Sequence, residues 1–508
     1  SLSYISVDPE NEVYRVENNC LINNQSNSVE IGLPGAVIPE GIQGIDSYAF
    51  EARKDILEIV LPGSIEEIGS SAFCDCSNLK KINIPESVKK IGDSAFKNCS
   101  SLESITIPEQ MDEIREETFY GCSGLQAITI PKGIRWINNS AFCMCGNLNE
   151  ISVDPENTKY RSEKNCLIER DSNKLMKGSC KDGNIDIPED INTIGDYAYQ
   201  GSQLLTDVVI PDTVTNIGYS AFASCSQLKS IVVSNNKTEV ASSVFSGCNA
   251  LTEVNLTLEN IGEYMFYRCE NLKIITMENT VHTIRESAFS GCINLQNIIF
   301  SDNLETIGAS GFYMCRSLNK VVLPNSILEI GGKCFSGCEK LEQVTLPEKL
   351  TVINYDMFFG CVSLKNIDLS DDITYIGDGT FSGCVNLEDI QLPSNLGVIS
   401  EELFANCENL QRITLPNGVR EIEDGAFSGC KNLSEIVFSS NLESIRYRAF
   451  RDCVKLETIK IPSKVIQIMD EAFYGCSNLK EVHIPSNIEK IADDAFKDCE
   501  NLSGIIFE

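Results

Sequence analysis

The sequence is poor in tryptophan, histidine and basic residues. Its 508 residues include one Trp and two His, and 41 Lys and Arg stand against 73 Asp and Glu, a net charge of −32. This charge repels phosphate backbones and anionic lipid headgroups, so it disfavours binding to nucleic acid or to a membrane surface. No 18 apolar residues follow one another, so no membrane span is predicted. A hydrophobic content of 42% with dispersed charge indicates a folded chain.

The motifs of common active sites are also missing. The two histidines, His282 and His483, are 201 residues apart, so we expect no zinc site that uses both. A catalytic triad would have to rest on one of them alone. The sequence contains no G-x-x-x-x-G-K-[ST] loop, no G-x-G-x-x-G after a strand and no D-x-D-x-D-G calcium loop. We therefore predict no catalytic, cofactor or metal residues, no cofactor, and no enzyme activity.

The sequence contains a phenylalanine that recurs every 23 residues. The first series is Phe50, Phe73, Phe96, Phe119 and Phe142. After an interruption the same position, which we call the aromatic slot, holds Tyr199, Phe222, Phe245, Phe266, Phe289, Phe312, Phe335, Phe358, Phe381, Phe404, Phe427, Phe450, Phe473 and Phe496. One step departs from 23, because 21 residues separate Phe245 from Phe266. The chain thus contains nineteen in-phase repeats.

Each repeat combines a strand pattern with a turn pattern, as in "IGDSAFKNCSSLESITIP" at 91–108. A leucine stands six residues after the aromatic slot in eighteen repeats, and I-x-I-P or a close relative follows it. This alternation predicts a short strand that ends at a proline corner. The other half, I-x-x-I-G-x-x-A-F-x-x-C, predicts a tight turn or a single helical turn. Because one repeat is too short to enclose a core, the repeats must stack and share one.

The full pattern L-x-x-I-x-I-P-x-x-V-x-x-I-G-x-x-A-F-x-x-C resembles the BspA-like class of leucine-rich repeats, and the resemblance covers nearly the whole chain. It implies an α/β-type leucine-rich repeat solenoid, mostly β, with about twenty 23-residue turns in a curved parallel stack. We expect a right-handed path, since parallel crossovers almost always take that hand. The class is found among bacterial surface proteins and some protozoan ones. The resemblance therefore also implies a secreted or surface-attached protein that binds host or microbial proteins.

Two matching segments depart from the 23-residue repeat. Residues 6–22 and 152–168 agree at thirteen of seventeen positions, and we expect each to form a projecting hairpin. Such a hairpin is either a docking element or a decorated turn. Met176 stands 23 residues before Tyr199 and is taken as the aromatic slot of one degenerate turn. The predicted division is an irregular or hairpin segment at 1–35, a first repeat block at 36–150, a hairpin-like insertion with the degenerate turn at 151–184, and a second repeat block at 185–508.

Of the 23 cysteines, 17 stand three residues after the aromatic slot. This constant phase predicts that they point into the core and pack as small hydrophobic side chains. Stacked side chains point the same way, which disfavours disulfides between neighbouring turns, and a linear row cannot surround a zinc ion. Cys74 and Cys143 instead follow the aromatic slot directly. We expect these two to face outward and to be the most reactive thiols.

Candidate contact residues come from two rows of outward positions. Ten residues after the aromatic slot, Ile299 and Val322 form an apolar pair in adjacent turns. Six residues before the slot, three successive turns carry apolar side chains, and an earlier turn carries the only tryptophan. Exposed Tyr and Trp are typical interface anchors. The predicted partner-binding residues are Val352, Tyr375 and Val398 as the preferred patch, then Ile299 and Val322, and Trp136.

The expected function is a non-enzymatic protein–protein interaction module, which the resemblance places among secreted or cell-surface adhesins with the targeting segment removed. A cytoplasmic leucine-rich repeat scaffold is the alternative, because unpaired cysteines are typical of a reducing compartment. A hydrolase is a more distant alternative. The acidic charge favours a protein partner with a neutral or basic face. The final "GIIFE" lacks a polar capping segment, so we expect further sequence after Glu508 or end-to-end self-association there.

Overall fold

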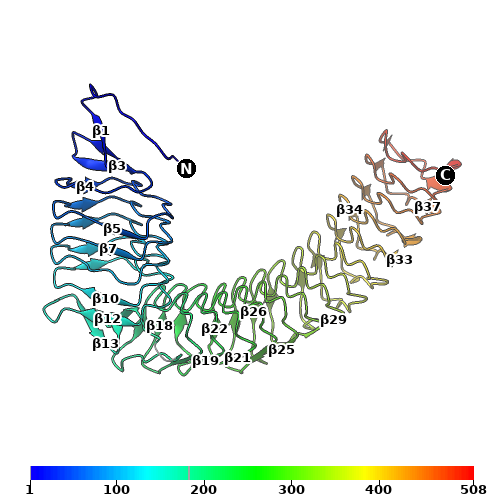
Figure 1. The fold of residues 1–508 in the computed structure, drawn as a ribbon. Helices are drawn as coiled ribbons and strands as arrows, with labels where there is room; N and C mark the ends of the chain where they lie inside the picture. Colours follow the sequence, from blue (N-terminus) through cyan, green and yellow to red (C-terminus); the bar gives the residue numbers. More distant parts are fainter. Residues whose placement is uncertain (1, 181–182) are drawn as a thin grey trace. The chain divides into compact units, whose positions relative to one another are not determined.

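The computed structural model describes residues 2–180 and 183–508. Within those residues the chain forms 41 short strands and no helix. It divides into two compact units, Ser1–Leu251 (unit 1) and Thr252–Glu508 (unit 2). In each unit the turns stack so that equivalent strands pair in parallel (Figure 1). The predicted mostly-β parallel solenoid with about twenty turns of 23 residues is confirmed.

The I-x-I segment of the repeat forms the first strand of a turn, and we call the column of these strands the long ladder. Alternate side chains point into the core, as in β5, where Ile59 is buried and Glu58 and Val60 are exposed. In unit 1 the long ladder comprises β5 (Glu58–Val60), β7 (Lys81–Asn83), β10 (Ala127–Ile130), β12 (Glu150–Val153), β17 (Asp207–Ile210) and β19 (Ser230–Val233). In unit 2 it comprises β21 (Glu253–Leu256), β23 (Ile274–Met277), β25 (Asn297–Ile299), β27 (Lys320–Val322), β29 (Gln343–Thr345), β33 (Arg412–Thr414), β35 (Glu435–Val437), β37 (Thr458–Lys460), β39 (Glu481–Ile484) and β41 (Gly504–Phe507).

The residue pair before the repeat's glycine forms a second, two-residue strand, and we call this column the short ladder. Its isoleucine is buried and the residue before it faces outward, as in β6. In unit 1 it comprises β4 (Gly44–Ile45), β6 (Glu67–Ile68), β8 (Lys90–Ile91), β9 (Glu113–Ile114), β11 (Trp136–Ile137), β16 (Thr193–Ile194), β18 (Asn216–Ile217) and β20 (Glu239–Val240). In unit 2 it comprises β22 (Asn260–Ile261), β24 (Thr283–Ile284), β26 (Thr306–Ile307), β28 (Glu329–Ile330), β30 (Val352–Ile353), β31 (Tyr375–Ile376), β32 (Val398–Ile399), β34 (Glu421–Ile422), β36 (Ser444–Ile445), β38 (Gln467–Ile468) and β40 (Lys490–Ile491).

The aromatic slots form a column of stacked rings in the core of each unit. In unit 1 the rings of Phe50 and Phe73 lie 5.1 Å apart between centroids and 7° from parallel. In unit 2 the rings of Phe266 and Phe289 lie 5.4 Å apart and 1° from parallel. Such ring pairs contribute beyond the area that they bury. The recurrence of phenylalanine in the sequence is therefore a consequence of this shared core.

The cysteine three residues after the aromatic slot has a second role besides packing. Its thiol donates a hydrogen bond to the carbonyl oxygen of the aromatic residue one turn earlier, as from Cys76 to Phe50 at 3.0 Å and from Cys315 to Phe289 at 3.4 Å. Sixteen such bonds, each spanning 26 residues, occur among the described residues. Of the 23 cysteines, 22 are buried and Cys499 is half-buried. The cysteines that stand three residues after the aromatic slot are core residues, as their phase predicts, and most of them also donate to a backbone carbonyl in the turn before.

The prediction that Cys74 and Cys143 face outward is wrong. Cys74 is 9% exposed and Cys143 only 1%. The longer side chains of Glu51 and Lys97 occupy the same position in the turns on either side of Cys74, and the turn of Tyr199 packs over that of Cys143. Burial raises the pKa of Cys74 to about 11 and that of Cys143 to about 12. Both thiols are therefore protonated and poorly reactive near neutral pH.

We expect Cys499 to be alkylated first when the folded protein meets iodoacetamide. It is the one cysteine of the chain that is half-buried instead of buried. Its pKa is raised to about 11, mainly by desolvation, so reaction will be slow but measurable at alkaline pH. Peptide mass mapping after short pulses, with and without denaturant, gives the order of labelling. Labelling of Cys74 or Cys143 as fast as Cys499 would contradict the burial described here.

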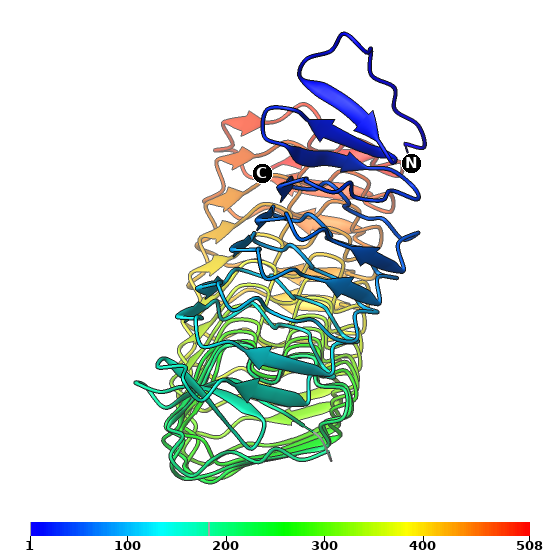
Figure 2. The same cartoon turned by 60° about the vertical axis from the view of Figure 1, so that its left-hand side comes forward.

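The two matching sequence segments form three-stranded antiparallel meanders that are part of the solenoid. The first meander comprises β1 (Tyr14–Glu17), β2 (Cys20–Asn23) and β3 (Ser28–Gly32), and the second comprises β13 (Tyr160–Glu163), β14 (Cys166–Glu169) and β15 (Lys174–Lys177). The third strand of each pairs in parallel with the short ladder, β3 with β4 and β15 with β16. Figure 2 shows the first meander, in dark blue, at one end of the stack in unit 1. Each meander thus begins a short ladder instead of projecting from it.

A glycine at the end of each meander covers the first ring of an aromatic column. A Cβ atom on Gly32 would lie 1.9 Å from Cε1 of Phe50, and one on Gly178 would lie 2.0 Å from Cζ of Tyr199. Only glycine therefore fits against either ring. Because Gly178 covers Tyr199 and Leu175 pairs with Ile194, Met176 does not occupy an aromatic slot, contrary to the expectation from the repeat spacing. Residues 181 and 182 of the expected insertion lie outside the described residues.

Candidate functional site

Ile299 and Val322 lie on the outer face of the long ladder in unit 2. Their side chains are 58% and 53% exposed. They line an open depression of about 710 Å³ together with Ile274, Asn297, Ile298, Asn319, Lys320, Glu342 and Gln343. A small-molecule site is normally a concave cavity that encloses most of its ligand. This open surface, with an apolar centre and polar surroundings, has instead the composition of a protein contact.

Val352 and Tyr375 lie side by side on the short ladder of unit 2. They are paired residues of β30 and β31, and they are 37% and 42% exposed. Val398 is half-buried, and its strand β32 pairs with β34. Ser400 stands where the repeat has glycine, and its hydroxyl donates to the carbonyl oxygen of Ile376 at 2.5 Å. Val352 and Tyr375 are therefore direct neighbours on the short ladder. Val398 is less exposed, and the pairing of described strands is interrupted between β31 and β32.

Trp136 lies on the short ladder of unit 1. Its side chain is 47% exposed, and it pairs across the ladder with Glu113. All five other candidates belong to unit 2, so Trp136 does not share a patch with them within its own unit. Because its paired residue Glu113 is acidic, this surface combines an apolar and a charged side chain. The exposure predicted for the tryptophan is observed.

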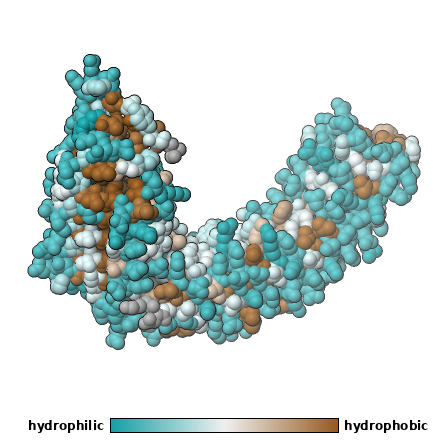
Figure 3. Space-filling model, viewed as in Figure 1, coloured by the Kyte–Doolittle hydropathy of each residue, from teal (hydrophilic) through white to brown (hydrophobic). Residues whose placement is uncertain are grey.

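A further apolar surface in unit 1 was not selected from the sequence. Val60 on β5 is 74% exposed and Leu57 just before this strand is 57% exposed. Figure 3 shows hydrophobic side chains gathered in the region of β4 to β7. The positions ten residues after the aromatic slot do not reveal this patch, because Asn83 and Thr106 follow Val60 in that row. A pattern that also followed the residue before each strand would have found Leu57.

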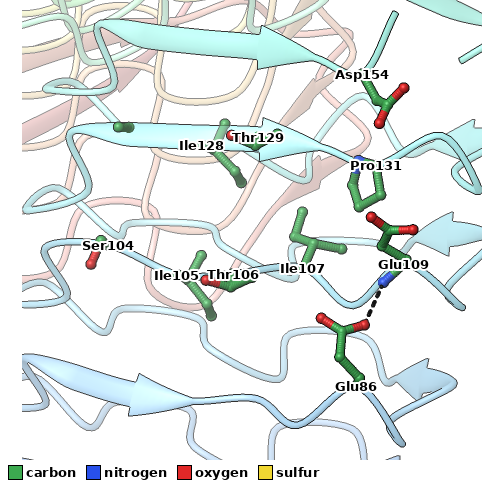
Figure 4. A pocket seen from close by; sticks show the side chains of 11 residues that line it. Glu86, Ser104, Ile105, Thr106, Ile107, Glu109, Ile128, Thr129, Pro131 and Asp154 are labelled. Atoms are coloured by element: carbon green, nitrogen blue, oxygen red, sulfur yellow. Dashed lines mark hydrogen bonds between the residues drawn. The ribbon is translucent and has the colours of Figure 1, made fainter. Parts of the chain in front are cut away.

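A smaller depression of about 350 Å³ lies beside this region on the long ladder of unit 1 (Figure 4). It opens where residues 105–107 form no strand and only Ser104 bridges to the next turn, at Ala127. Three carboxylates, those of Glu86, Glu109 and Asp154, line one side of it. The carboxylate of Glu86 accepts a hydrogen bond from the backbone N–H of Glu109 at 3.1 Å. This acidic edge favours a basic contact.

The repeat pattern and the stacked ladders agree with a known protein family. The description "BspA type Leucine rich repeat region (6 copies)" matches residues 43–166, 173–296, 259–388, 305–421 and 398–508. The chain belongs to the BspA-type leucine-rich repeat family. No protein of curated function matches this BspA-type chain.

Solved structures of bacterial proteins resemble this BspA-type chain at low identity. A leucine-rich repeat protein from Bacteroides ovatus is 24% identical, with 97% of each chain covered and a TM-score of 0.45. A leucine rich cell surface protein from Faecalibacterium prausnitzii is 26% identical over 69% of this chain and 93% of its own, with a TM-score of 0.38. The T. pallidum leucine rich repeat protein is 32% identical over 41% of this chain and 84% of its own, with a TM-score of 0.31.

The two histidines of the BspA-type chain have ordinary polar neighbours. His483 lies between Glu481 and Glu508, with its ring nitrogens 2.9 and 2.7 Å from their carboxylates. Nδ1 of His282 lies 2.8 Å from the carbonyl oxygen of Thr280. Across residues 2–180 and 183–508, no group of three or more His, Cys, Asp or Glu is placed to hold a metal ion. The same residues include no helix long and apolar enough to cross a membrane.

Proposed function

We propose that this BspA-type protein binds another protein without transforming it, and that its contact surface is the depression around Ile299 and Val322. The observation that carries this proposal is the exposure of two aliphatic side chains by more than half in adjacent turns, where both line the same depression. Large exposed apolar groups surrounded by polar ones mark interaction surfaces. The pair Val352 and Tyr375 on the short ladder is the second candidate surface.

The partner has a neutral or basic face. The chain carries a net charge of −32, and Glu342 lies at the edge of the depression. Complementary charge accelerates association and its effect is screened by salt. Affinity for such a partner will therefore fall as ionic strength rises. Trp136 and the depression edged by Glu86, Glu109 and Asp154 are further contact candidates in unit 1.

We also propose that the protein acts outside the cell or at its surface as an adhesin. The support is its family resemblance to bacterial surface proteins. The alternative, a cytoplasmic scaffold, rests on the large number of cysteines, 23 in the chain, because a reducing compartment keeps thiols reduced. That support is weakened because 22 of them are buried and thus protected from oxidants. Protease treatment of intact cells that express the native gene distinguishes the two locations, since only a surface protein will be removed.

Replacing Ile299 and Val322 together by serine will weaken partner binding by about tenfold or more, as expected for the centre of an interface. Thermal stability will change little, because both side chains are exposed at the surface. The measurement is retention of proteins from host and microbial extracts on immobilised wild-type and variant protein, identified by mass spectrometry. The matched control is Val437→Ser, which holds the equivalent outward position on β35 of the long ladder and is also exposed.

A parallel replacement, Tyr375→Ser, tests the second surface. If it abolishes retention while the Ile299 and Val322 variant retains the same proteins, the contact lies on the short ladder. If unfolding temperature drops sharply in any of these variants, the altered side chain contributes to the core and its surface assignment is wrong. Retention that survives all of these changes would contradict both surfaces.

A further inference from the structure

Three consecutive turns of unit 2 carry exposed apolar side chains on the short ladder. Leu328, which stands directly before β28, is 73% exposed, and Val352 and Tyr375 are 37% and 42% exposed. Val352 and Tyr375 are paired residues of neighbouring strands, and Leu328 lies in the turn before them. We call these three residues the apolar stripe. Contiguous exposed apolar groups mark interaction surfaces.

The neighbours of the apolar stripe along the short ladder are uncharged. In the turns of β30, β31 and β32, the residue before the strand and its first residue are Thr351 and Val352, Thr374 and Tyr375, and Gly397 and Val398. In the turns on either side one of these positions is charged, as Glu329 and Arg420 show. The centre of a protein interface is depleted of charged residues in the same way. This composition favours a protein partner.

The loops before and after these strands are acidic. Eight acidic residues stand against two lysines in the four segments 325–334, 348–357, 371–380 and 394–403. One of the lysines, Lys333, already has its Nζ 3.7 Å from Oδ2 of Asp356. Partial desolvation and the nearby carboxylates of Asp424 and Asp378 raise the pKa of Glu401. The apolar stripe is therefore flanked by an excess of negative charge.

The tyrosines of this surface can accept a cation on their rings. Tyr355, three residues after Val352, is 49% exposed. Its ring packs on the backbone of Gly332, since a Cβ atom there would lie 2.5 Å from Cε1 of the ring. Nζ of Lys333 lies 5.8 Å from the centre of the same ring. A cation is attracted by the face of a tyrosine ring, and the half-exposed ring of Tyr375 offers the same interaction to a partner.

The depression around Ile299 and Val322 differs from the apolar stripe in its charge. Its lining includes one lysine, Lys320, and one glutamate, Glu342, so their charges balance. Opposite charge on two surfaces accelerates their association and selects between partners. A preference for a basic partner therefore belongs to the apolar stripe more than to this depression.

We propose that the apolar stripe and its acidic flanks bind a basic segment of another protein, in which arginine or lysine alternates with apolar side chains. This inference rests on the proposed function and specifies the chemistry of its second surface. The apolar side chains of the segment cover Leu328, Val352 and Tyr375, and its cations reach the carboxylates of the loops on either side. The contact buries apolar area and brings opposite charges together, so its affinity falls as salt rises.

The test is fluorescence anisotropy of a short labelled peptide in which arginine alternates with leucine, mixed with the 508-residue chain. Wild-type protein will bind this peptide at least about tenfold more tightly than either of two counterparts. Glutamate replaces arginine in the first counterpart, which loses the opposite charge. Serine replaces leucine in the second, which loses the apolar contact. Equal binding of the three peptides would overturn the proposal.

Two double variants show where the peptide binds. Leu328→Ser with Tyr375→Ser removes exposed apolar side chains and will weaken binding by about tenfold or more. Asp378→Asn with Glu401→Gln removes two exposed carboxylates beside the apolar stripe. It will weaken binding by about fivefold, as expected for the loss of two exposed ion pairs.

The matched controls lie on the long ladder of unit 2. Glu253→Gln with Glu435→Gln removes the same charge from exposed positions of β21 and β35, and Val437→Ser removes an exposed apolar side chain. These controls will leave peptide binding unchanged, and all variants will unfold at the wild-type temperature because the altered residues lie at the surface. Equal weakening by the two charge variants would overturn the proposal, since net charge and not the apolar stripe would then attract the peptide.

The proposed function is measured separately, by retention of proteins from extracts. A wild-type protein that retains partners but does not bind the arginine–leucine peptide would overturn this inference alone. Peptide binding that the Ile299 and Val322 variant removes, and that Leu328→Ser with Tyr375→Ser leaves unchanged, would overturn it as well. That result would place the basic segment on the long ladder.

Discussion

Replacing Phe289 by alanine will lower the free energy of unfolding by about 3–5 kcal/mol. The side chain is fully buried, and its ring is stacked between those of Phe266 and Phe312 at 5.4 and 5.3 Å. Truncation removes the buried ring and leaves a cavity inside the column, so both neighbouring rings lose a face contact. Because each turn is stabilised by the turns beside it, the loss extends to them. Denaturant unfolding followed by circular dichroism measures the change.

The control for this loss is a phenylalanine outside the column. Phe359 stands directly after an aromatic slot and is 46% exposed. Its replacement by alanine will change stability by no more than about 0.5 kcal/mol, as is usual for surface positions. Hydrogen exchange will show the faster opening of Phe289→Ala concentrated in the turns around it. Equal losses in the two variants would contradict the stacked column as the main core.

Replacing Lys177 by methionine will raise the free energy of unfolding by about 1–3 kcal/mol, because it removes a buried polar group that lacks a hydrogen bond. Lys177 ends β15, is 2% exposed, and its Nζ has no described hydrogen-bond partner. The titratable groups that interact with it are the thiols of Cys145, Cys143 and Cys225. Methionine has a similar length and fills irregular space well. The substitution therefore keeps the packing and removes the amine.

The pH dependence of this difference follows from the direction of the pKa shift. Burial lowers the pKa of Lys177 below its ordinary value of 10.5. Between the folded and the unfolded pKa the unfolded chain binds more protons, so wild-type stability rises with pH in that range. The advantage of Lys177→Met is thus largest below the folded pKa and shrinks as pH approaches 10.5.

The matched control is Lys174→Met on the same strand, where the lysine is only half-buried and its Nζ lies 3.5 Å from Oδ1 of Asn139. We expect its stability to stay within about 0.5 kcal/mol of wild type at all pH values. Urea unfolding at a series of pH values measures all three proteins. A Lys177→Met variant that is less stable than wild type would show that the amine has a favourable role in the core.

The sequence predicts the solenoid because its core positions keep one phase over nineteen repeats. A phenylalanine that recurs at a constant interval predicts stacked turns that share one core. The buried rings of Phe73 and Phe289 confirm this prediction. The burial of the cysteines that stand three residues after the aromatic slot follows from the same phase. The exposure of Ile299, Val322 and Trp136 also agrees with the period-two and turn patterns. Periodicity thus determines which side of a turn a residue faces.

Periodicity does not determine what lies beside a residue in the neighbouring turn. Cys74 was expected to be exposed because its position points away from the column, but longer side chains beside it bury it. The same limit applies at the interruption, where the repeat spacing assigned Met176 to a ring position that Gly178 covers. Lys177 and Gln200 each hold a buried polar atom without a described partner there. Such contacts between unlike turns need the three-dimensional structure.

The thiol-to-carbonyl bond between neighbouring turns also bears on how the length of such an array changes in evolution. Most turns donate from their cysteine to the aromatic carbonyl of the turn before, so adjacent turns meet through the same pair of groups. Removal of residues 336–358 from a gene would place Cys361 three residues after Phe335. Its thiol would then reach the carbonyl of Phe312, which Cys338 binds in the present chain. Recombination between repeats can therefore add or delete whole turns and preserve this bond, so array length is free to vary while the bonding between turns stays constant.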